Sequence, residues 1–333
     1  MRLLVTMKPE AYEGPTGSYG VLAEIEWPAG EIVRQVRFPT ASFRCSEAFM
    51  APLIGGVCHA HGKLYVAMWN HIVVVDYASF QIIDAFSDPW MADLHGLTTD
   101  GTHLWAAATA SESVLCFDLT SQQRLWRWGP DAPLLAQHNP HPPSLWQRLQ
   151  QLWQRKAPLR QEWRHLHKSR IPGYRHHLND VTYHDGRLII TTKQWYKSLP
   201  GAVIQLDLNG QEAHFIAPPG SFRGTHDTEW LNERLYFTEA DANGVGWLEA
   251  DGTMGHKSIE PNNYFVRGLC WSGEQFVVGY TRQRGTRDPA LLVGFDPSFE
   301  ASLTTMELEG FYPPEQGTAI HDIQRSPDGE TTL

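Results

Sequence analysis

The chain contains 333 residues, of which 42% are hydrophobic and 19% are charged, and its formal net charge is −10. An acidic chain without a basic block is poorly suited to bind nucleic acid in general. No apolar run reaches the roughly 18 residues that a membrane-spanning helix requires, and the N-terminus is charged too early for a signal peptide. We therefore expect a cytoplasmic protein that binds neither nucleic acid nor membranes.

The first strands are predicted at residues 2–7, 19–27 and 31–38. A complete unit of four strands follows, which opens at Gly55-Gly56-Val57, and a second unit opens at His95-Gly96-Leu97. In each unit a short strand opens on a small or polar residue, a Gly or Asp and an aliphatic residue, and a second apolar strand follows after a turn. The recurrence of this pattern indicates a repeat fold.

An insertion interrupts the repeat between residues 129 and 174. It contains a Pro-rich run at 138–143 and then residues 144–153, whose apolar side chains fall on one face of a predicted amphipathic helix. Links between repeats of this kind lie on the face where the inner strands begin, so the insertion is predicted to form a helical lid over that face. A dimerisation arm, which would make the chain a homodimer, and a packing helix are the alternatives.

Three more units open at Asn179, His226 and Arg267, and a sixth opening at His321-Asp322-Ile323 comes close to the C-terminus. Units of roughly 40–50 residues with four strands each are typical of propeller blades. The sixth unit lacks three strands, which the N-terminal strands can supply. We therefore predict an all-β fold, a single six-bladed β-propeller domain over residues 1–333 whose N- and C-terminal strands close one blade, with a helical lid-like insertion.

Two further sets of residues are predicted to be structural. Most third strands end on an aspartate before a turn, which predicts bonding of the carboxylate to turn amides rather than catalysis. These residues are Asp76, Asp118, Asp207 and Asp296. The four cysteines lack CxxC spacing and are predicted to be buried free thiols.

The opening residues carry the functional prediction, because the first polar residue of each inner strand is expected to point towards the axis at the channel mouth. They are Gly55, His95, Asn179, His226, Arg267 and His321. The three histidines occupy alternate blades, and three imidazoles with an open position are typical of a catalytic metal site. We predict a divalent transition metal (zinc, iron, copper or manganese) bound by His95, His226, His321 and Asn179. The alternative for each histidine is an ordinary polar residue at a strand end.

Residues around the ring are candidates for chemistry. His226 is a candidate general base, Asp227 or Asp322 would orient it or act as a base, and Arg267 would neutralise an anion. His177 is a further acid/base candidate, with a plain loop histidine as the alternative. Loops at the same mouth are rich in cationic and aromatic side chains, which predicts an anionic or aromatic substrate. The predicted substrate-binding residues are Arg267, Asn179, Trp195, Tyr196, Lys197 and Arg282.

The motifs His95-Gly96-Leu97 and Asn179-Asp180-Val181 resemble the Asn-Gly-Leu and Asp-Gly-Leu openings of the six-bladed propellers of the gluconolactonase and senescence-marker group, which has strictosidine-synthase-like and paraoxonase-like relatives. The resemblance implies a central divalent cation, often calcium or zinc. This chain departs from that group in having Gly55 where the group has an acid, and in offering His226 and His321 where it uses oxygen ligands. Calcium is therefore less favoured than a transition metal.

Three functions are compatible with these residues. The leading hypothesis is a metal-assisted enzyme that acts on a small anionic or aromatic metabolite at the channel mouth, by hydrolysis, by lyase or isomerase chemistry, or by oxidation. The second is a metal-free enzyme that uses a ring histidine as acid or base. The third is a propeller that serves as a binding scaffold without catalysis.

Overall fold

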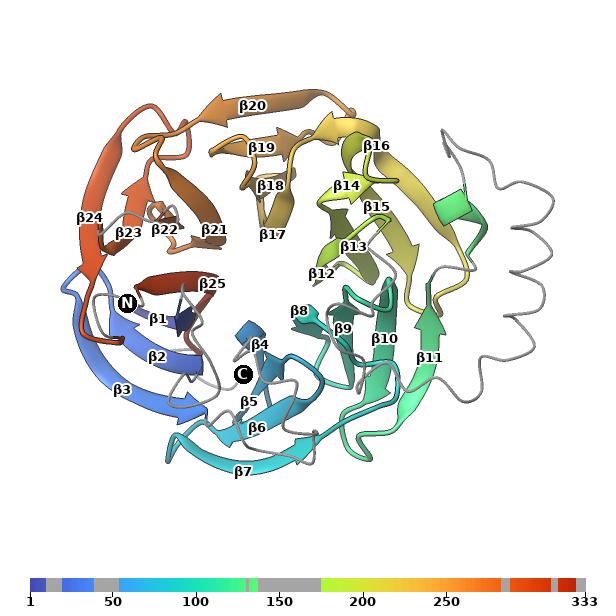
Figure 1. Cartoon of the computed structure of the whole chain (residues 1–333), viewed down its shortest axis with the longest axis horizontal. Coiled ribbons are helices and arrows are strands. Elements are labelled where there is room, and N and C mark those ends of the chain that lie inside the picture. Colours follow the sequence, from blue (N-terminus) through green and yellow to red (C-terminus); the bar gives the residue numbers. More distant parts are fainter. Residues whose placement is uncertain are drawn as a thin grey trace.

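In the computed structural model, six antiparallel sheets surround a central axis as the blades of a propeller (Figure 1). The structure describes residues 1–9, 20–38, 54–129, 132–136, 175–282, 288–312 and 317–327. In each blade the first strand lies nearest the axis and the last lies at the rim. The predicted all-β six-bladed propeller is confirmed.

The strands of the blades follow one another in chain order. Blade one is β4 (Ile54–Ala60), β5 (Lys63–Met68), β6 (Ile72–Asp76) and β7 (Gln81–Phe86). Blade two is β8 (Leu94–Thr99), β9 (His103–Ala108), β10 (Ser113–Asp118) and β11 (Arg124–Trp128). Blade three is β12 (Leu178–His184), β13 (Arg187–Thr192), β15 (Leu199–Asp207) and β16 (Ala213–Phe222), with the short β14 (Gln194–Trp195) paired to β15.

Blade four is β17 (Thr225–Leu231), β18 (Arg234–Glu239), β19 (Gly244–Leu248) and β20 (Met254–Ser258). Blade five is β21 (Tyr264–Trp271), β22 (Phe276–Arg282), β23 (Ala290–Phe295) and β24 (Ser302–Leu308). Blade six is β25 (Thr318–Arg325), β1 (Arg2–Pro9), β2 (Gly20–Glu26) and β3 (Glu31–Phe38). The sequence predicted these strands to within a few residues, except β14, which was not expected, and β16, which was expected to end at residue 217.

Burial explains the sequence pattern of the strands. Second strands such as β5 and β9 are buried on both faces, because blades pack against each other on either side, and they consist almost entirely of apolar residues. Rim strands such as β24 alternate between exposed and buried side chains, since one of their faces meets solvent. The apolar runs that marked the repeat are therefore the second strands of the blades, which are covered on both faces by neighbouring blades.

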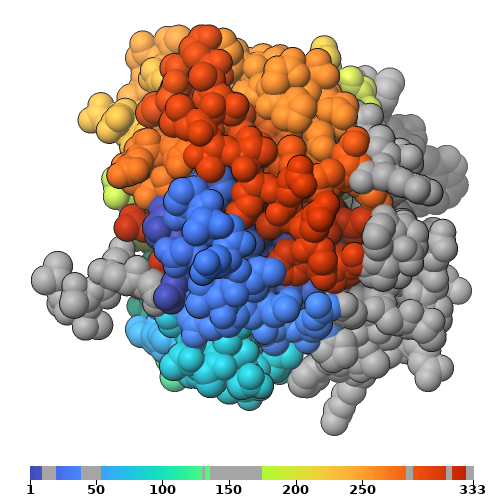
Figure 2. All heavy atoms as spheres, turned by 90° about the vertical axis from the view of Figure 1, so that its left-hand side faces the viewer, coloured from blue at the N-terminus to red at the C-terminus, as the bar shows by residue number. Residues whose placement is uncertain are grey.

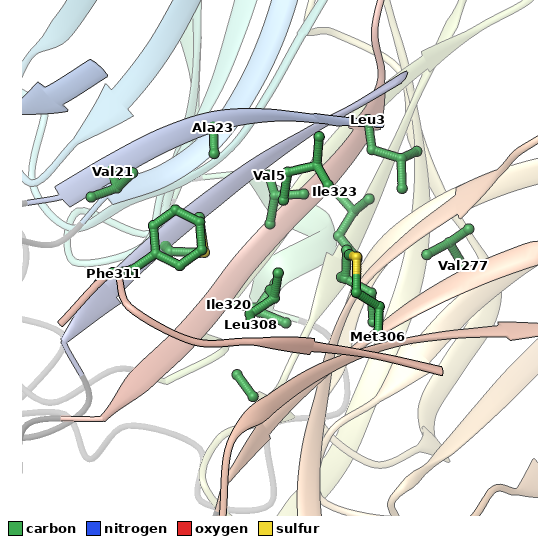
Figure 3. Close-up of a cluster of buried hydrophobic side chains, with 14 of the residues drawn as sticks. Leu3, Val5, Val21, Ala23, Val277, Met306, Leu308, Phe311, Ile320 and Ile323 are labelled. Atoms are coloured by element: carbon green, nitrogen blue, oxygen red, sulfur yellow. The ribbon is translucent and has the colours of Figure 1, made fainter. Parts of the chain in front are cut away.

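Blade six closes the ring, because β25 from the C-terminal region pairs with β1 from the N-terminal region. Figure 2 shows the N-terminal strands, in blue, against the C-terminal segment, in orange and red. An apolar cluster lies between this blade and blade five (Figure 3), with Leu3, Val5 and Val21 on one side and Val277 and Met306 on the other. The predicted closure by the two termini is confirmed.

Threonine hydroxyls connect neighbouring blades near the face where the inner strands begin. Thr6 Oγ1 donates to the carbonyl of Gly55 in the next blade at 2.9 Å, and Thr281 Oγ1 donates to the carbonyl of Ile320 at 3.2 Å. Both hydroxyls are buried, so each bond satisfies a polar group that would otherwise be unpaired. These bonds fix the inner strands relative to one another.

The predicted turn aspartates are confirmed. The carboxylates of Asp76, Asp118 and Asp296 accept the amide N–H of a serine two or three residues later, at 2.7, 2.7 and 2.8 Å. Asp207 accepts the N–H of Gln211 at 2.7 Å. Hydrogen bonds from the turn lower the pKa of the carboxyls of Asp76, Asp118 and Asp296.

In the described part of the chain, the prediction of free thiols is confirmed, and the prediction that they are buried is confirmed for two of the three. Cys58, Cys116 and Cys270 are free thiols, and Cys116 and Cys270 are buried, whereas Cys58 is partly accessible. Cys45 lies outside the described residues. Within the same described ranges, no helix has the length and apolar character needed to cross a membrane.

Most of the predicted insertion lies outside the described residues, including the helix expected at 144–153. Of residues 129–174, the structure describes Gly129 and residues 132–136, which contain a short 3-10 helix, η2 (Pro133–Ala136). The lid and the dimerisation arm stay predictions.

Glu229 gives a test of how blades four and five are joined. Its carboxylate accepts the N–H of Trp271 at 3.2 Å, and burial raises its pKa to about 7. Between the ordinary carboxyl pKa and about pH 7, Glu229 is ionised in the unfolded chain but still protonated in the folded one. The free energy of unfolding therefore falls as the pH rises through this interval, and it levels off above it. We expect Glu229→Gln to raise the free energy of unfolding by about 2 kcal/mol at pH 8, because a neutral amide avoids the buried charge.

Chemical denaturation at pH 4 and pH 8 checks this expectation. At pH 4 the native carboxyl is already protonated, so the variant and the wild type should unfold at nearly the same denaturant concentration. A gain of equal size at both pH values would contradict the assignment.

Candidate functional site

All six inner strands contain a register shift at the same place, where the opening residues lie. The residues skipped by the pairing are Gly55 and Gly56, His95 and Gly96, Asn179, Asp227, Gly268 and His321. Such β-bulges add a residue to one strand and redirect its side chains, and they are common next to active sites. The bulges explain why consecutive residues of one opening can both lie near the axis.

Four histidine rings gather at this point, with His95 in the middle. The His95 ring centroid lies 5.0 Å from that of His321, 5.5 Å from that of His177 and 6.2 Å from that of His226. We call His95, His177, His226 and His321 the histidine cluster. The predicted convergence of the three alternate-blade histidines is therefore present, and the loop residue His177 joins them.

Two polar contacts orient the cluster. The amide nitrogen of Asn179 donates to the carbonyl of Thr225 at 2.6 Å and lies 3.1 Å from His226 Nε2. This nitrogen of His226 therefore accepts, which leaves the ring proton on Nδ1 in the neutral form. On the other side of the cluster, His95 Nε2 lies 3.5 Å from the carboxylate of the buried Asp93.

The histidine cluster is uncharged at neutral pH. Burial lowers the pKa of all four rings, and for His177 the value falls to about 3. The positive charge of Arg267 lowers the pKa of each ring further. The Asp93 carboxylate acts in the opposite direction on His95 and His177, and it is His95 that it contacts directly.

Three polar atoms of the site are buried and lack a hydrogen bond within the part of the chain that the structure describes. They are His95 Nδ1, His321 Nδ1 and Asn179 Oδ1. An unsatisfied buried polar atom costs about 1–3 kcal/mol, so each such atom in a native protein calls for an explanation. At the axis, three of them from three different blades are available to a ligand.

Arg267 supplies the positive charge. Burial lowers the pKa of its guanidinium, while Asp227, Asp93 and Asp241 raise it. Among the described residues its guanidinium makes no ion pair within 4.0 Å, unlike Lys193, which is paired with Asp241 at 3.2 Å. A guanidinium beside neutral imidazoles, on a residue that is partly accessible, is suited to bind an anion.

The three acids of the openings connect blades. Asp322 accepts the N–H of Val57 at 2.9 Å, and Asp227 accepts that of Gly268 at 2.7 Å. Asp180 accepts that of Thr228 at 3.2 Å. These bonds go to backbone amides of the next blade rather than to imidazoles.

The pKa of each of these three carboxyls is raised, by burial in every case and also by a neighbouring carboxylate for Asp180 and Asp227. For Asp180 burial and the charge of Asp322 raise the pKa to about 7, and for Asp322 burial raises it to about 6. The pKa of Asp227 lies well above its ordinary value, through burial and the charges of Asp322 and Asp180. Part of this group therefore holds protons at neutral pH.

The predicted substrate-binding residues separate into two groups. Arg267 and Asn179 lie in the site, whereas Trp195 is fully buried, with its ring 4.4 Å from that of His176. The two-residue strand β14 turns Trp195 inward, which the expectation of an open loop did not allow for. Tyr196 donates its hydroxyl to the carbonyl of Leu135 at 2.8 Å.

The two remaining predicted residues are placed differently. Lys197 is exposed and adopts a left-handed backbone conformation, with φ of 61°. Arg282 is buried at the end of β22, and its guanidinium packs against Gly317.

The described residues do not test the predicted metal site. Among the described residues, no group of three or more His, Cys, Asp or Glu side chains is arranged to hold one ion. The donors nevertheless suit a transition metal, because the imidazoles are neutral and His95 and His321 each have an Nδ1 without a partner. Coordination of one ion by His95, Asn179, His226 and His321 would require the rings to reorient.

Sequence reasoning missed Asp93 and Lys8. Asp93 contacts His95, and Lys8 on β1 lies close enough to lower the pKa of His95 and His321. Asp93 comes two residues before a ring histidine, which is a usable signal, but no other blade has an acid there. An alignment of repeats therefore did not single it out.

No family model and no curated protein sequence matches the chain. Solved structures do share its fold. A chain in the crystal structure of a nidogen/laminin complex superposes with a TM-score of 0.59 at 10% identity, covering 97% of this chain and 98% of that one. A streptogramin B lyase gives 0.54 at 10% identity, with 98% and 93% covered.

A third similar structure is a catalytically inactive histidine-to-alanine variant of virginiamycin B lyase from Staphylococcus aureus, with quinupristin. It gives a TM-score of 0.50 at 12% identity, covering 79% of this chain and 73% of that one. Identities this low establish the propeller fold alone. The resemblance to the gluconolactonase group stays a prediction.

Gly96 tests the packing beneath the histidine cluster. A Cβ at this position would lie 1.9 Å from Asp180 Oδ1 and 2.8 Å from Asp180 Cα. We expect Gly96→Ala to displace Asp180 from Thr228 and to lower the free energy of unfolding by about 2–3 kcal/mol, measured by urea denaturation.

Gly62→Ala is the matched control. Its Cβ would meet nothing within 4 Å, but its φ of +70° is strained for alanine, so only a backbone effect of about 1 kcal/mol is expected. Equal losses in the two variants would contradict a steric role for Gly96.

Proposed function

We propose that this protein is an enzyme that acts on a small anionic metabolite at the axial site. The observation that supports this most strongly is the gathering of four neutral imidazoles beside Arg267, with three buried polar atoms that have no hydrogen bond among the described residues. A site with these features can hold a charged group and exchange a proton with its neighbour.

Arg267 would bind the anionic group of the substrate. Once bound, the anion offsets the positive charge that lowers the pKa of the histidine cluster. The imidazoles therefore become better bases when the substrate is present than when it is absent. This coupling would suit proton abstraction, or activation of water, next to a carboxylate.

His95 is the favoured general base. It lies at the centre of the histidine cluster, and it has a carboxylate, Asp93, beside its Nε2. That arrangement stabilises the imidazolium formed when Nδ1 takes a proton. The sequence pointed to His226 for this role, but Asn179 lies at its Nε2, which supports a positioning role for His226.

A metal-assisted reaction is the second candidate. It is favoured by one observation, the two unpartnered imidazole nitrogens and the unpartnered Asn179 oxygen on three different blades. A zinc, iron, copper or manganese ion would supply Lewis acidity towards a substrate carbonyl or a bound water. His95, His321 and Asn179 would then bind this ion, and His226 or His177 would lie next to it.

The similar structures support an enzyme on this fold by analogy only. One is a streptogramin B lyase, and in the related virginiamycin B lyase a histidine variant is described as catalytically inactive. The nidogen/laminin structure supports the opposite possibility, a propeller that binds another protein without catalysis.

The cytoplasm stays our proposed location, supported by the three free thiols. A homodimer through residues 129–174 also stays a proposal.

Arg267→Met tests anion binding. We expect the wild type to bind at least one of citrate, benzoate and phosphate in a calorimetric titration, and the variant to bind it about 10–100-fold more weakly, since a charge-assisted hydrogen bond contributes roughly 1.5–3 kcal/mol. Arg234→Met is the matched control, because Arg234 lies on blade four and pairs with Glu249, whereas Arg267 lies on blade five. Equal affinity of the wild type and Arg267→Met would contradict this role.

His95→Ala tests catalysis, and metal analysis separates the two candidates. With a substrate that binds at Arg267, we expect turnover to fall about 100–10,000-fold in His95→Ala, because a general base is lost. His184→Ala, at the opposite face of the propeller, should leave turnover unchanged.

The same proteins are purified without chelators or a histidine tag and analysed for metals. Near-stoichiometric metal that is lost in both His95→Ala and His321→Ala would favour the second candidate. Turnover without metal would favour the first, and neither turnover nor metal would favour a scaffold.

A further inference from the structure

Blade four carries a second group of reactive side chains, separate from the axial site. His256 on β20 bonds through Nδ1 to the carboxylate of Glu239 on β18, and its Nε2 lies 3.2 Å from the hydroxyl of Ser258. Glu239 is buried, whereas Ser258 is exposed. The order is that of an activated nucleophile: a hydroxyl, an imidazole within hydrogen-bond reach, and a carboxylate that orients the imidazole.

Two glycines make this contact possible. Glu239 and His256 lie on strands separated by β19, where Gly244 is paired with Glu239 and Gly246 with His256. A Cβ at Gly244 would meet His256 Cε1 at 2.5 Å, and a Cβ at Gly246 would lie 3.0 Å from Glu239 Oε2. The absence of both side chains opens a groove across β19, through which the carboxylate reaches the imidazole.

The strand pairing places the three groups on one face of the blade. Ser258 and His256 are two residues apart on β20, so their side chains project from the same side. The other oxygen of Glu239 accepts the N–H of Arg223 at 2.8 Å, which holds the carboxylate in position. With Nδ1 donating to Glu239, Nε2 is the nitrogen that accepts from Ser258.

We propose that Ser258, His256 and Glu239 form a second catalytic site, in which Ser258 is the nucleophile that cleaves small carboxylic esters. Ser258 Oγ attacks the ester carbonyl carbon and passes its proton to His256 Nε2. The bond to the leaving oxygen breaks, and the proton moves to the departing alcohol. Water then attacks the acyl-serine with His256 as the base, which releases the carboxylic acid and restores the hydroxyl. Glu239 is the positioning residue.

A fluorophosphonate probe applied to the full chain tests the nucleophile, because Ser258 would displace fluoride from phosphorus. Peptide mass spectrometry should find the adduct on Ser258. Labelling should be lost in Ser258→Ala and should fall about 100-fold or more in His256→Ala, as expected when a general base is removed. Ser298→Ala is the control, because that exposed serine bonds to Asp296 rather than to a histidine.

Hydrolysis of p-nitrophenyl acetate measures turnover at the same site. Ser258→Ala should remove it, and Ser298→Ala should leave it unchanged, because Ser298 bonds to Asp296 and belongs to neither site. Both substituted side chains on β20 are exposed, and an unchanged melting temperature confirms that the variants fold. Labelling spread over other serines, or equal labelling of wild type and His256→Ala, would overturn the proposal.

Glu239→Gln tests the positioning role. The amide can still accept from Arg223 N–H, so the loop contact is retained. In p-nitrophenyl acetate hydrolysis the variant should have a kcat about 10-fold or more below that of the wild type and an unchanged KM, because the imidazole is no longer held towards Ser258. An unchanged kcat would overturn the role of Glu239.

Discussion

The antiparallel pairing of β25 with β1 is the contact on which the axial site depends. It joins the two ends of the chain and closes the ring of blades, so that His321, from near the end of the sequence, comes within 5.0 Å of His95. Closure also removes the free edges that an open stack of sheets would present. The apolar cluster of Leu3, Val277 and Met306 stabilises this junction, and the polar residues at the axis are positioned by it.

The centre of the molecule combines groups that are costly to bury. Neutral imidazoles, a guanidinium and three carboxyls lie close to the axis, and each of these carboxyls accepts a hydrogen bond from a backbone amide of the next blade. Apolar packing between blades offsets the free-energy cost of burying these polar groups, because the interfaces between the sheets bury large aliphatic surfaces. Gly96 shows how little room remains, because its missing side chain is the space occupied by Asp180.

Repetition made the fold and the ring predictable from sequence. Five second strands aligned on their apolar residues, and this register placed His95, Asn179, His226, Arg267 and His321 at one level. Features without repetition were not predictable in this way. The bulges, Asp93 and the inward turn of Trp195 each depend on local backbone geometry. The Ser258, His256 and Glu239 group was missed because its members come from two strands, separated by a third whose only signal is the pair Gly244 and Gly246.

Gly55 makes the axial site asymmetric about the central axis. A side chain here would collide with the carbonyl oxygens of Leu94 and His95, both 2.6 Å from a Cβ, so blade one presents only backbone where the other five blades present side chains. The ring therefore has no rotational symmetry, although the fold that builds it is nearly regular. A ligand held by its charge at Arg267 therefore meets a different group from each blade. Rotation of the ligand about the axis would change every one of these contacts, so the site favours a single orientation.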